Sequence, residues 1–180
     1  LPIPASAESQ AACLDFIVER LRNWLLESGE RFDVVEAVVS VQGNNPARAS
    51  QAVRQLSAWI ARPDWNRILP AYARCVRIIR SAGGLAAAAY QPLPDTEPAE
   101  LELYAALQTA EETLRQLPGS RTPDDFLNAF LPMIPAVDRF FEAVLVMVED
   151  EAVRLNRLAL MGRIAVLAEG VADLAKLEGF

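Results

Sequence analysis

Apolar residues recur at helical spacing along most of the chain, and the longest such pattern runs from Asp150 to Leu177. Apolar residues three, four or seven positions apart share one face of an α-helix. This segment lacks proline, and a second row of small and apolar residues widens the face. A helix with so wide an apolar face must be surrounded by other helices. The pattern therefore predicts one long central helix over 150–177, in an all-α domain. Its main face consists of Val153, Leu160, Ile164, Leu167, Val171 and Leu174.

Shorter amphipathic segments, separated by glycine and proline clusters, predict the remaining helices. There is no alternating strand pattern and no long internal repeat. The fold class expected is all-α, a helical bundle of about seven or eight helices around the long C-terminal helix. The first helix has an apolar face of Leu14, Ile17, Val18, Leu21 and Leu25. The helices before the last are expected at about 9–28, 33–41, 46–61, 66–81, 98–117, 123–130 and 136–147.

Several residues indicate where these helices begin and end. Gly29 is a natural C-cap, and Asp33 is expected to cap the second helix with its side chain. Thr122 followed by Pro123 and two acids is a strong helix start. Pro70 predicts either a kink or the true first turn of its helix.

The domain organisation follows from the same pattern. Residues 1–8 look like a linker remnant, so the chain is expected to be a piece of a longer protein, with 9–180 as a single domain. The stretch at about 83–98 is rich first in alanine and then in proline, which predicts a mobile loop.

Composition excludes several classes of function. At 52% hydrophobic and 23% charged residues, the chain of 180 residues is typical of a globular domain. No apolar run reaches the roughly 18 to 20 residues of a membrane span, so no membrane partner is expected. Two cysteines in helical patterns fit a reducing cytoplasm. The absence of histidine excludes histidine-based metal sites and catalytic triads.

Basic charge is concentrated in one part of a chain whose net charge is -7. Between Arg48 and Arg80 there are seven arginines and one acid, Asp64. Arginine suits bidentate phosphate contacts, although high arginine usage also follows from a GC-rich genome. Arg67, Arg74, Arg77 and Arg80 lie roughly on one side of their helix, either to contact phosphates or as a solvated face.

A second polar group begins the last helix: Arg154, Asn156, Arg157 and Arg163. Arginine and asparagine present paired hydrogen-bonding groups that suit base edges. The alternative is internal pairing, of Arg154 with Asp150 and of Arg157 with Asp138.

Aromatic residues raise the same question. Phe140 and Phe141 offer a stacking surface for a base, or belong to the core, where at least one is expected. The same two alternatives apply to Trp24, Trp59 and Trp65. The acid pairs 111–112 and 124–125 point to different sides of a helix and make no metal cluster.

Two segments are distinctive as written: VDRFFEAVLVMVEDEAVRLNRLAL at 137–160, and FIVERLR at 16–22 followed by RFDVVEAV at 31–38. They resemble the C-terminal region of the bacterial glycyl-tRNA synthetase beta subunit, which is similar to the DALR-type anticodon-binding domains. The resemblance runs over nearly the whole chain.

The resemblance implies an anticodon-binding role for tRNA(Gly) within an α2β2 enzyme in the cytoplasm. It implies that ATP and Mg²⁺ belong to the alpha subunit and that this fragment carries no cofactor and no catalytic site. The partners implied are tRNA(Gly), the alpha subunit and the rest of the beta subunit. The candidate tRNA-binding residues are Arg67, Arg74, Arg77, Arg80, Arg139, Arg154, Asn156, Arg157 and Arg163.

Two other classes of function compete with this interpretation. The acidic C-terminal half suits a helical protein–protein module that docks on another subunit without contacting RNA. An independent enzyme is the third alternative, but no nucleophile–base pair, phosphate-binding glycine loop or metal-ligand spacing is visible.

Overall fold

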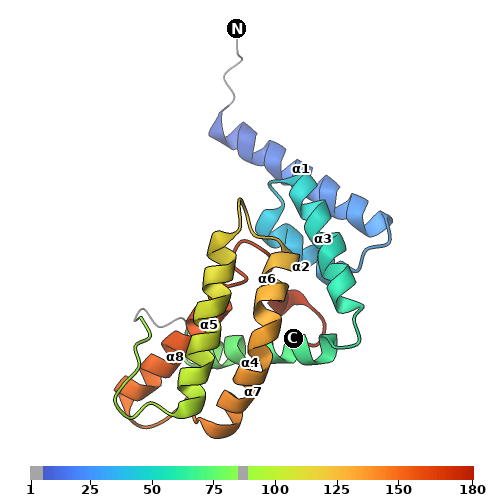
Figure 1. Cartoon of the computed structure of the whole chain (residues 1–180). Coiled ribbons are helices and arrows are strands. Elements are labelled where there is room, and N and C mark those ends of the chain that lie inside the picture. Colours follow the sequence, from blue (N-terminus) through green and yellow to red (C-terminus); the bar gives the residue numbers. More distant parts are fainter. Residues whose placement is uncertain (1–5, 85–88) are drawn as a thin grey trace.

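The computed structural model describes residues 6–84 and 89–180, and in these residues it contains helices and no strands (Figure 1). This confirms the all-α fold class and the predicted number of helices. The eight α-helices are α1 (Ala7–Glu27), α2 (Phe32–Gln42), α3 (Pro46–Ile60), α4 (Trp65–Ser81), α5 (Pro98–Gln116), α6 (Pro123–Phe130), α7 (Ile134–Ala143) and α8 (Glu151–Val166). Two 3-10 turns, η1 (Leu131–Met133) and η2 (Leu174–Lys176), complete the described elements.

The helices form two connected groups around one hydrophobic core. In Figure 1, α1, α2 and α3 lie at the top right, and α5 runs beside α6 and α7. Helix α4 crosses behind this second group and packs against α8. Tyr72 of α4 anchors the crossing, since its ring makes edge contacts with Phe126 and Phe130 of α6 at 5.5 and 5.7 Å between ring centroids. Its hydroxyl donates to the Ala165 carbonyl oxygen of α8 at 2.8 Å. Helix α4 therefore has one face held in the core and the other free for solvent.

The long central helix predicted over 150–177 is wrong in length. Helix α8 ends at Val166, and Gly170 follows with a left-handed φ of +72°. The chain then folds back onto α2, where the Asp173 N–H donates to the Ala37 carbonyl oxygen at 2.8 Å and the Gln42 side chain donates to the Val171 carbonyl oxygen. Apolar residues that the pattern placed on one straight rod are thus buried by a turn against α2.

Helix α7 is also shorter than predicted, because it ends at Ala143 and Val144 is extended. Leu145 and Met147, expected within this helix, lie exposed in the connection to α8, while Val146 is buried between them. The expected start of α8 is confirmed, since Asp150 caps it by accepting from the Val153 N–H.

The helix-boundary signals have mixed outcomes. Thr122 and Asp125 form the reciprocal capping box at the start of α6, and Gly29 follows α1 with a left-handed φ of +90°, both as predicted. Asp33 is not the cap of α2, because Phe32 already begins the helix. Pro70 lies inside α4, five residues after its start, so it does not mark the first turn.

Helix α1 lies partly outside the body of the molecule. It starts at Ala7, after the cap Ser6, which is two residues earlier than predicted. Leu21 and Leu25 of its predicted apolar face are buried, but Leu14 and Ile17 are about 40% exposed (41% and 40%). Figure 1 shows the reason: the N-terminal half of α1 extends past the other helices.

Two predictions fall partly outside the described residues, namely the linker at 1–8, of which 1–5 are not described, and the mobile loop at 83–98, of which 85–88 are not described. In the described part of the loop, Tyr90 is buried and its ring lies 4.7 Å from that of Tyr104. The backbone of Gln91 is hydrogen-bonded to the Asn156 side chain. Mobility of the segment stays a prediction.

Candidate nucleic-acid interface

The α4 arginine row, Arg67, Arg74, Arg77 and Arg80, lies on the exposed face of α4. Helix α4 is amphipathic, and its opposite face carries buried apolar residues that pack into the core. Within residues 6–84 and 89–180, no guanidinium of the row donates a hydrogen bond to a carboxylate. Four positive charges thus lie on the exposed side of one helix.

The row has two parts with different neighbours. Arg67 and Arg74 approach Asp138 of α7, with nitrogen–oxygen distances of 3.8 and 3.6 Å, which are longer than a hydrogen bond. The Arg74 guanidinium also lies over the Phe141 ring, 4.5 Å from its centroid. Exposed pairs of this kind contribute little to stability, so both arginines remain available to a ligand.

Arg77 and Arg80 lie at the other end of the row, around Phe180. Their guanidinium carbons are 5.7 and 5.5 Å from the centroid of the Phe180 ring. The described residues give these two side chains no ion pair. Phe180 was not a predicted site residue, and nothing in the local sequence signals its role, because the fold-back after α8 is what brings it to α4.

The α8 polar cluster, Arg154, Asn156, Arg157 and Arg163, is engaged inside the molecule. Arg157 is buried and donates from Nε to Glu100 Oε2 at 2.9 Å, so its predicted partner Asp138 is wrong. The Arg154 guanidinium donates to the carbonyl oxygens of Val148 and Glu149, and not to the carboxylate of Asp150. These contacts hold the irregular connection after α7.

Arg163 and Asn156 have equally specific internal partners. Arg163 donates through two nitrogens to the Glu111 carboxylate, and its guanidinium lies 5.2 Å from the Tyr104 ring centroid. The hydrogen bond to Glu111 raises the pKa of Arg163, although partial burial opposes this. Asn156 bonds both backbone groups of Gln91, at 2.9 and 2.7 Å. Of the two alternatives for the α8 polar cluster, base contact and internal pairing, the structure shows internal pairing. Few donors of these side chains are left for RNA.

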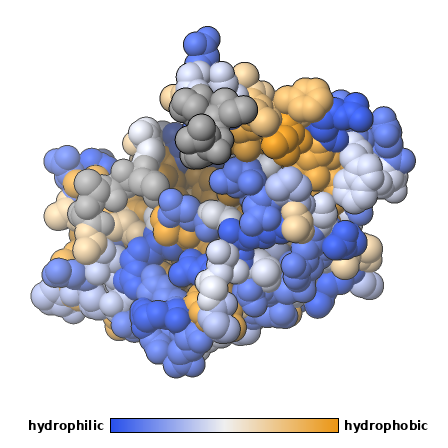
Figure 2. All heavy atoms as spheres, turned by 90° about the horizontal axis from the view of Figure 1, so that it is seen from above, coloured by the Kyte–Doolittle hydropathy of each residue, from blue (hydrophilic) through white to orange (hydrophobic). Residues whose placement is uncertain are grey.

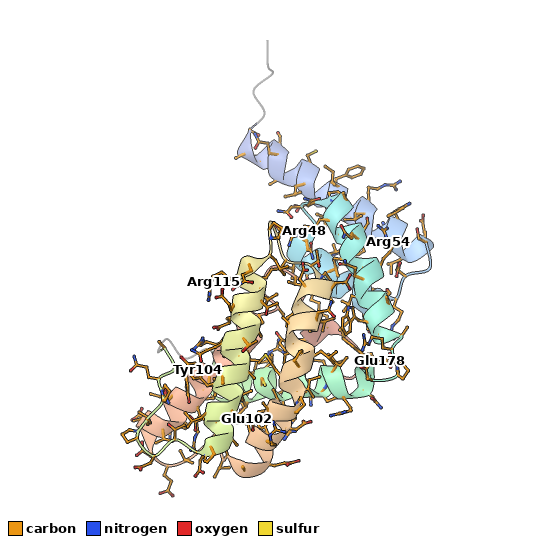
Figure 3. All side chains as sticks on the ribbon, viewed as in Figure 1. Arg48, Arg54, Glu102, Tyr104, Arg115 and Glu178 are labelled. Atoms are coloured by element: carbon orange, nitrogen blue, oxygen red, sulfur yellow. The ribbon has the colours of Figure 1, made fainter. Side chains whose placement is uncertain are left out.

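Arg139 lies apart from both groups, on α7. It forms a two-point ion pair with Glu102, which lies near the lower end of α5 in Figure 3. The hydrogen bond from Arg139 lowers the pKa of Glu102. Because both side chains are about half exposed, this pair is open to competition by a phosphate.

The aromatic residues divide between core and surface. Phe140 is fully buried, which confirms that at least one of the two phenylalanines belongs to the core. Trp59 is buried and donates to Asp124 at 2.8 Å, whereas Trp65 is half-buried against the core. Trp24 is 53% exposed on α1.

Two exposed arginines that were not predicted as site residues also have no ion pair in the described part of the chain. They are Arg20 on α1 and Arg54, on the outer side of α3 in Figure 3. By contrast, Arg48 donates to the carbonyl oxygens of Arg121 and Gly170, and thereby ties α3 to the turn after α8. The free arginine charge is therefore richest on α4.

Two further observations concern metal ligands and the length of apolar helices. Residues 6–84 and 89–180 contain no group of three or more Asp, Glu or Cys side chains arranged to hold a metal ion. No helix in the same residues is long and apolar enough to cross a membrane.

Comparison with known families decides the relationship. The family model of the DALR anticodon binding domain matches residues 68–174. The chain belongs to the DALR anticodon binding domain family. The matched region begins in α4 and ends in η2, so it contains three of the four arginines of the α4 row and all of α8.

Curated relatives extend the likeness of this DALR domain toward both ends of the chain. The chain is 38% identical over 168 residues to the glycine–tRNA ligase beta subunit of Anaeromyxobacter dehalogenans (strain 2CP-C), covering 92% of this chain and 23% of that protein. It is 33% identical over 165 residues to the same subunit of Edwardsiella ictaluri (strain 93-146), with coverages of 92% and 24%. It is 31% identical over 180 residues to the chloroplastic/mitochondrial glycine–tRNA ligase 2 of Arabidopsis thaliana, with coverages of 99% and 16%. The chain spans about a quarter of the length of these bacterial relatives. The predicted resemblance is confirmed.

Proposed function

We propose that this chain binds the anticodon arm of tRNA(Gly) through the α4 arginine row, as the anticodon-binding part of a glycine–tRNA ligase. The single observation that carries the proposal is the contrast between two sets of arginines. Those on α8 are hydrogen-bonded to internal carboxylates and carbonyls, whereas those on α4 are exposed and have no carboxylate hydrogen bond in the described residues. Binding a polyanion needs arginines of the second kind.

The role is one of binding and specificity. In this proposal, aminoacylation with ATP and Mg²⁺ takes place in the alpha subunit of an α2β2 enzyme in the cytoplasm, and this chain contributes binding. The names of the bacterial relatives support a place in such a ligase, since they are beta subunits of glycine–tRNA ligase. Arg139 is a secondary contact, because its exposed pair with Glu102 exchanges readily for a phosphate.

A salt-dependent titration tests the proposal. The chain is titrated with a tRNA(Gly) transcript at several salt concentrations, and the slope of log affinity against log salt is measured. Each phosphate that the protein neutralises adds about 0.7 to 0.9 to the magnitude of this slope. The double variant Arg77→Gln with Arg80→Gln is therefore expected to lower the magnitude of the slope by about 1 to 2.

The matched control removes the same charge from other helices, in the double variant Arg20→Gln with Arg54→Gln. This variant is expected to leave the slope nearly unchanged. Equal effects of the two double variants would show that affinity depends on overall charge and not on α4. Affinity that ignores changes in the anticodon bases would refute an anticodon-binding role.

A protein–protein interaction is the second candidate, and a different observation favours it. Phe16 and Trp24 of α1 and Phe32 of α2 are more than half exposed, at 66%, 53% and 67%. Figure 2, seen from above so that α1 faces the reader, shows an uncovered hydrophobic area among polar side chains. Capture of the chain by the alpha subunit without tRNA, abolished by Phe16→Ser, would favour this candidate. In this candidate the docking surface is the apolar area on α1 and α2, whereas the sequence suggested the acidic C-terminal half, which stays a prediction.

A further inference from the structure

A pocket of about 370 Å³ lies between the C-terminal half of α4, the end of α8 and the turn that follows. We call it the Phe180 pocket. Tyr72 is one of its lining residues, and the Tyr72 hydroxyl already donates to the Ala165 carbonyl oxygen. The walls are formed by the apolar side chains Val76, Ile79, Ala168, Ala172, Leu174 and Ala175. Its volume is within the range of pockets that hold small organic groups.

Charged residues also line the Phe180 pocket, and the basic and acidic ones come from different segments of the chain. Arg80 of α4 lines the pocket, and Arg77 stands beside the same Phe180 ring. Glu169 and Asp173, from the turn after α8, line it as well. Asp173 Oδ1 accepts from the Ala175 N–H at 3.2 Å, while no bond to its other oxygen is found in the described residues.

This combination selects for a particular kind of ligand. A free phosphate makes no favourable contact with apolar walls and is repelled by the two carboxylates. An aliphatic group makes no favourable interaction with the arginines. A nucleotide satisfies all three features: its base is flat and apolar on both faces, its phosphate pairs with arginine, and an amino group on its edge donates to a carboxylate. Cytosine, adenine and guanine carry such an amino group, and uracil does not.

We propose that the Phe180 pocket holds one unstacked base of the RNA loop, with Arg77 and Arg80 on the adjoining phosphate and Asp173 accepting from an amino group of the base. The inference rests on the proposed function, because the α4 arginine row brings the loop to the mouth of the pocket. It adds a place for base recognition, which the row by itself lacks, since phosphate contacts carry no sequence information.

The test combines a pocket variant with RNA variants. Hairpins carrying the anticodon arm of tRNA(Gly) are made with an abasic site at each loop position in turn, and their affinities for the chain are measured by fluorescence anisotropy. One position that bears an amino-carrying base is expected to lose about tenfold in affinity when abasic. Ala175→Phe places a ring in the pocket, so this variant is expected to bind the intact hairpin about tenfold more weakly and to become insensitive to that abasic site. Ala105→Phe, on the exposed face of α5, is the control and should behave as the parent chain.

A second variant makes the test independent of any effect of Ala175→Phe on folding. In Asp173→Asn the carboxylate becomes an amide, which is nearly the same size and still caps η2. The parent chain is expected to prefer the amino-carrying base over uracil at the sensitive position, and Asp173→Asn is expected to lose that preference while still binding.

The outcomes separate the two proposals. If the parent chain binds no hairpin at all, the proposed function fails. If it binds, but Ala175→Phe keeps the same sensitivity to every abasic site and Asp173→Asn keeps the same base preference, the pocket proposal is overturned and the proposed function stands.

Discussion

Arg157 and Glu100 form an ion pair inside the molecule, with Arg157 Nε donating to Glu100 Oε2 at 2.9 Å. Arg157 is 9% exposed and Glu100 is 2% exposed, so the pair joins α8 to α5 away from water. Arg157 also donates to the Leu145 carbonyl oxygen at 2.9 Å, which holds the connection between α7 and α8. A residue predicted to contact RNA is therefore a structural cross-link between three segments.

Removing one member of this pair is expected to be strongly destabilising. Glu100→Ala leaves a buried guanidinium with no counter-charge, which lowers the free energy of unfolding by about 3 to 5 kcal/mol. The measurement is chemical denaturation followed by circular dichroism. Glu102→Ala, two residues along the same helix, removes an exposed partner of Arg139 and should leave the transition nearly unchanged. Equal effects of the two substitutions would contradict the burial argument.

The two cysteines are expected to differ in reactivity. Cys75 is fully buried, and burial raises the pKa of its thiol to about 12, whereas Cys13 is exposed on α1. Because the thiolate is the reactive form, Ellman's reagent at pH 8 should titrate one thiol in the folded chain and two in guanidinium chloride. In Cys13→Ser no thiol should react before unfolding. Fast reaction of that variant under native conditions would show that α4 opens readily.

Asp33 gives the stability a pH dependence at the acidic end. Partial burial raises the pKa of its carboxyl, but hydrogen bonds from Arg31 and from the backbone N–H groups of Glu178 and Val34 outweigh this, so its pKa lies below the usual value of about 3.8. The folded state therefore binds its proton less tightly than the unfolded state. The resulting stabilisation is present above about pH 4 and is lost as the pH falls through the lower, folded-state pKa.

Asp33→Asn should accordingly be less stable than the parent chain at pH 7, by about 1 to 2 kcal/mol. The difference should shrink as the pH falls below 4, as the parent carboxyl becomes protonated through its lowered folded-state pKa. Denaturation curves of both proteins between pH 2 and 7 measure this. A difference that stays constant over the whole range would show that the effect is not due to the charge of Asp33.

Gly170 is expected to control where the chain turns back after α8. Its φ of +72° is left-handed, and an added Cβ would meet nothing within 4 Å, so the backbone conformation alone resists substitution. Gly170→Ala should lower the free energy of unfolding by about 1 to 2 kcal/mol. Gly170→Asn should lose less, because asparagine tolerates this region better. Thermal denaturation of both variants distinguishes backbone strain from simple intolerance of a side chain at this turn.

Arginines on α8 and α4 should respond in opposite ways to substitution. Arg163→Gln breaks the two-point pair with Glu111 and is expected to lower the melting temperature by several degrees while tRNA affinity changes little. Arg77→Gln is expected to leave the melting temperature unchanged and to weaken tRNA binding. Measuring melting and binding on the same preparations tests both halves. Loss of tRNA affinity in a folded Arg163→Gln protein would show that α8 takes part in tRNA binding.

Local sequence signals were sufficient where the forces are local. The reciprocal hydrogen bonds of Thr122 and Asp125 involve residues three positions apart, and the cap at Asp150 does likewise, so each is readable from the chain. The exposed arginine row on α4 was equally readable, because a 3.6-residue period separates its charged and apolar faces. The same period failed at Leu14 and Ile17, since it shows which face is apolar and not whether another helix covers it.

The sequence by itself determined that this protein is all-α, where most of its helices start, and which family it resembles, because periodicity, caps and motif residues act over a few positions. Only the tertiary structure decided that α8 stops at Val166 and which arginines stay free. The partners of Arg157 and Arg163 are acids on α5, 57 and 52 positions away along the chain. An arginine committed to such a distant carboxylate and one left open to solvent have the same appearance in a sequence, and they differ only in what the fold brings within 3 Å.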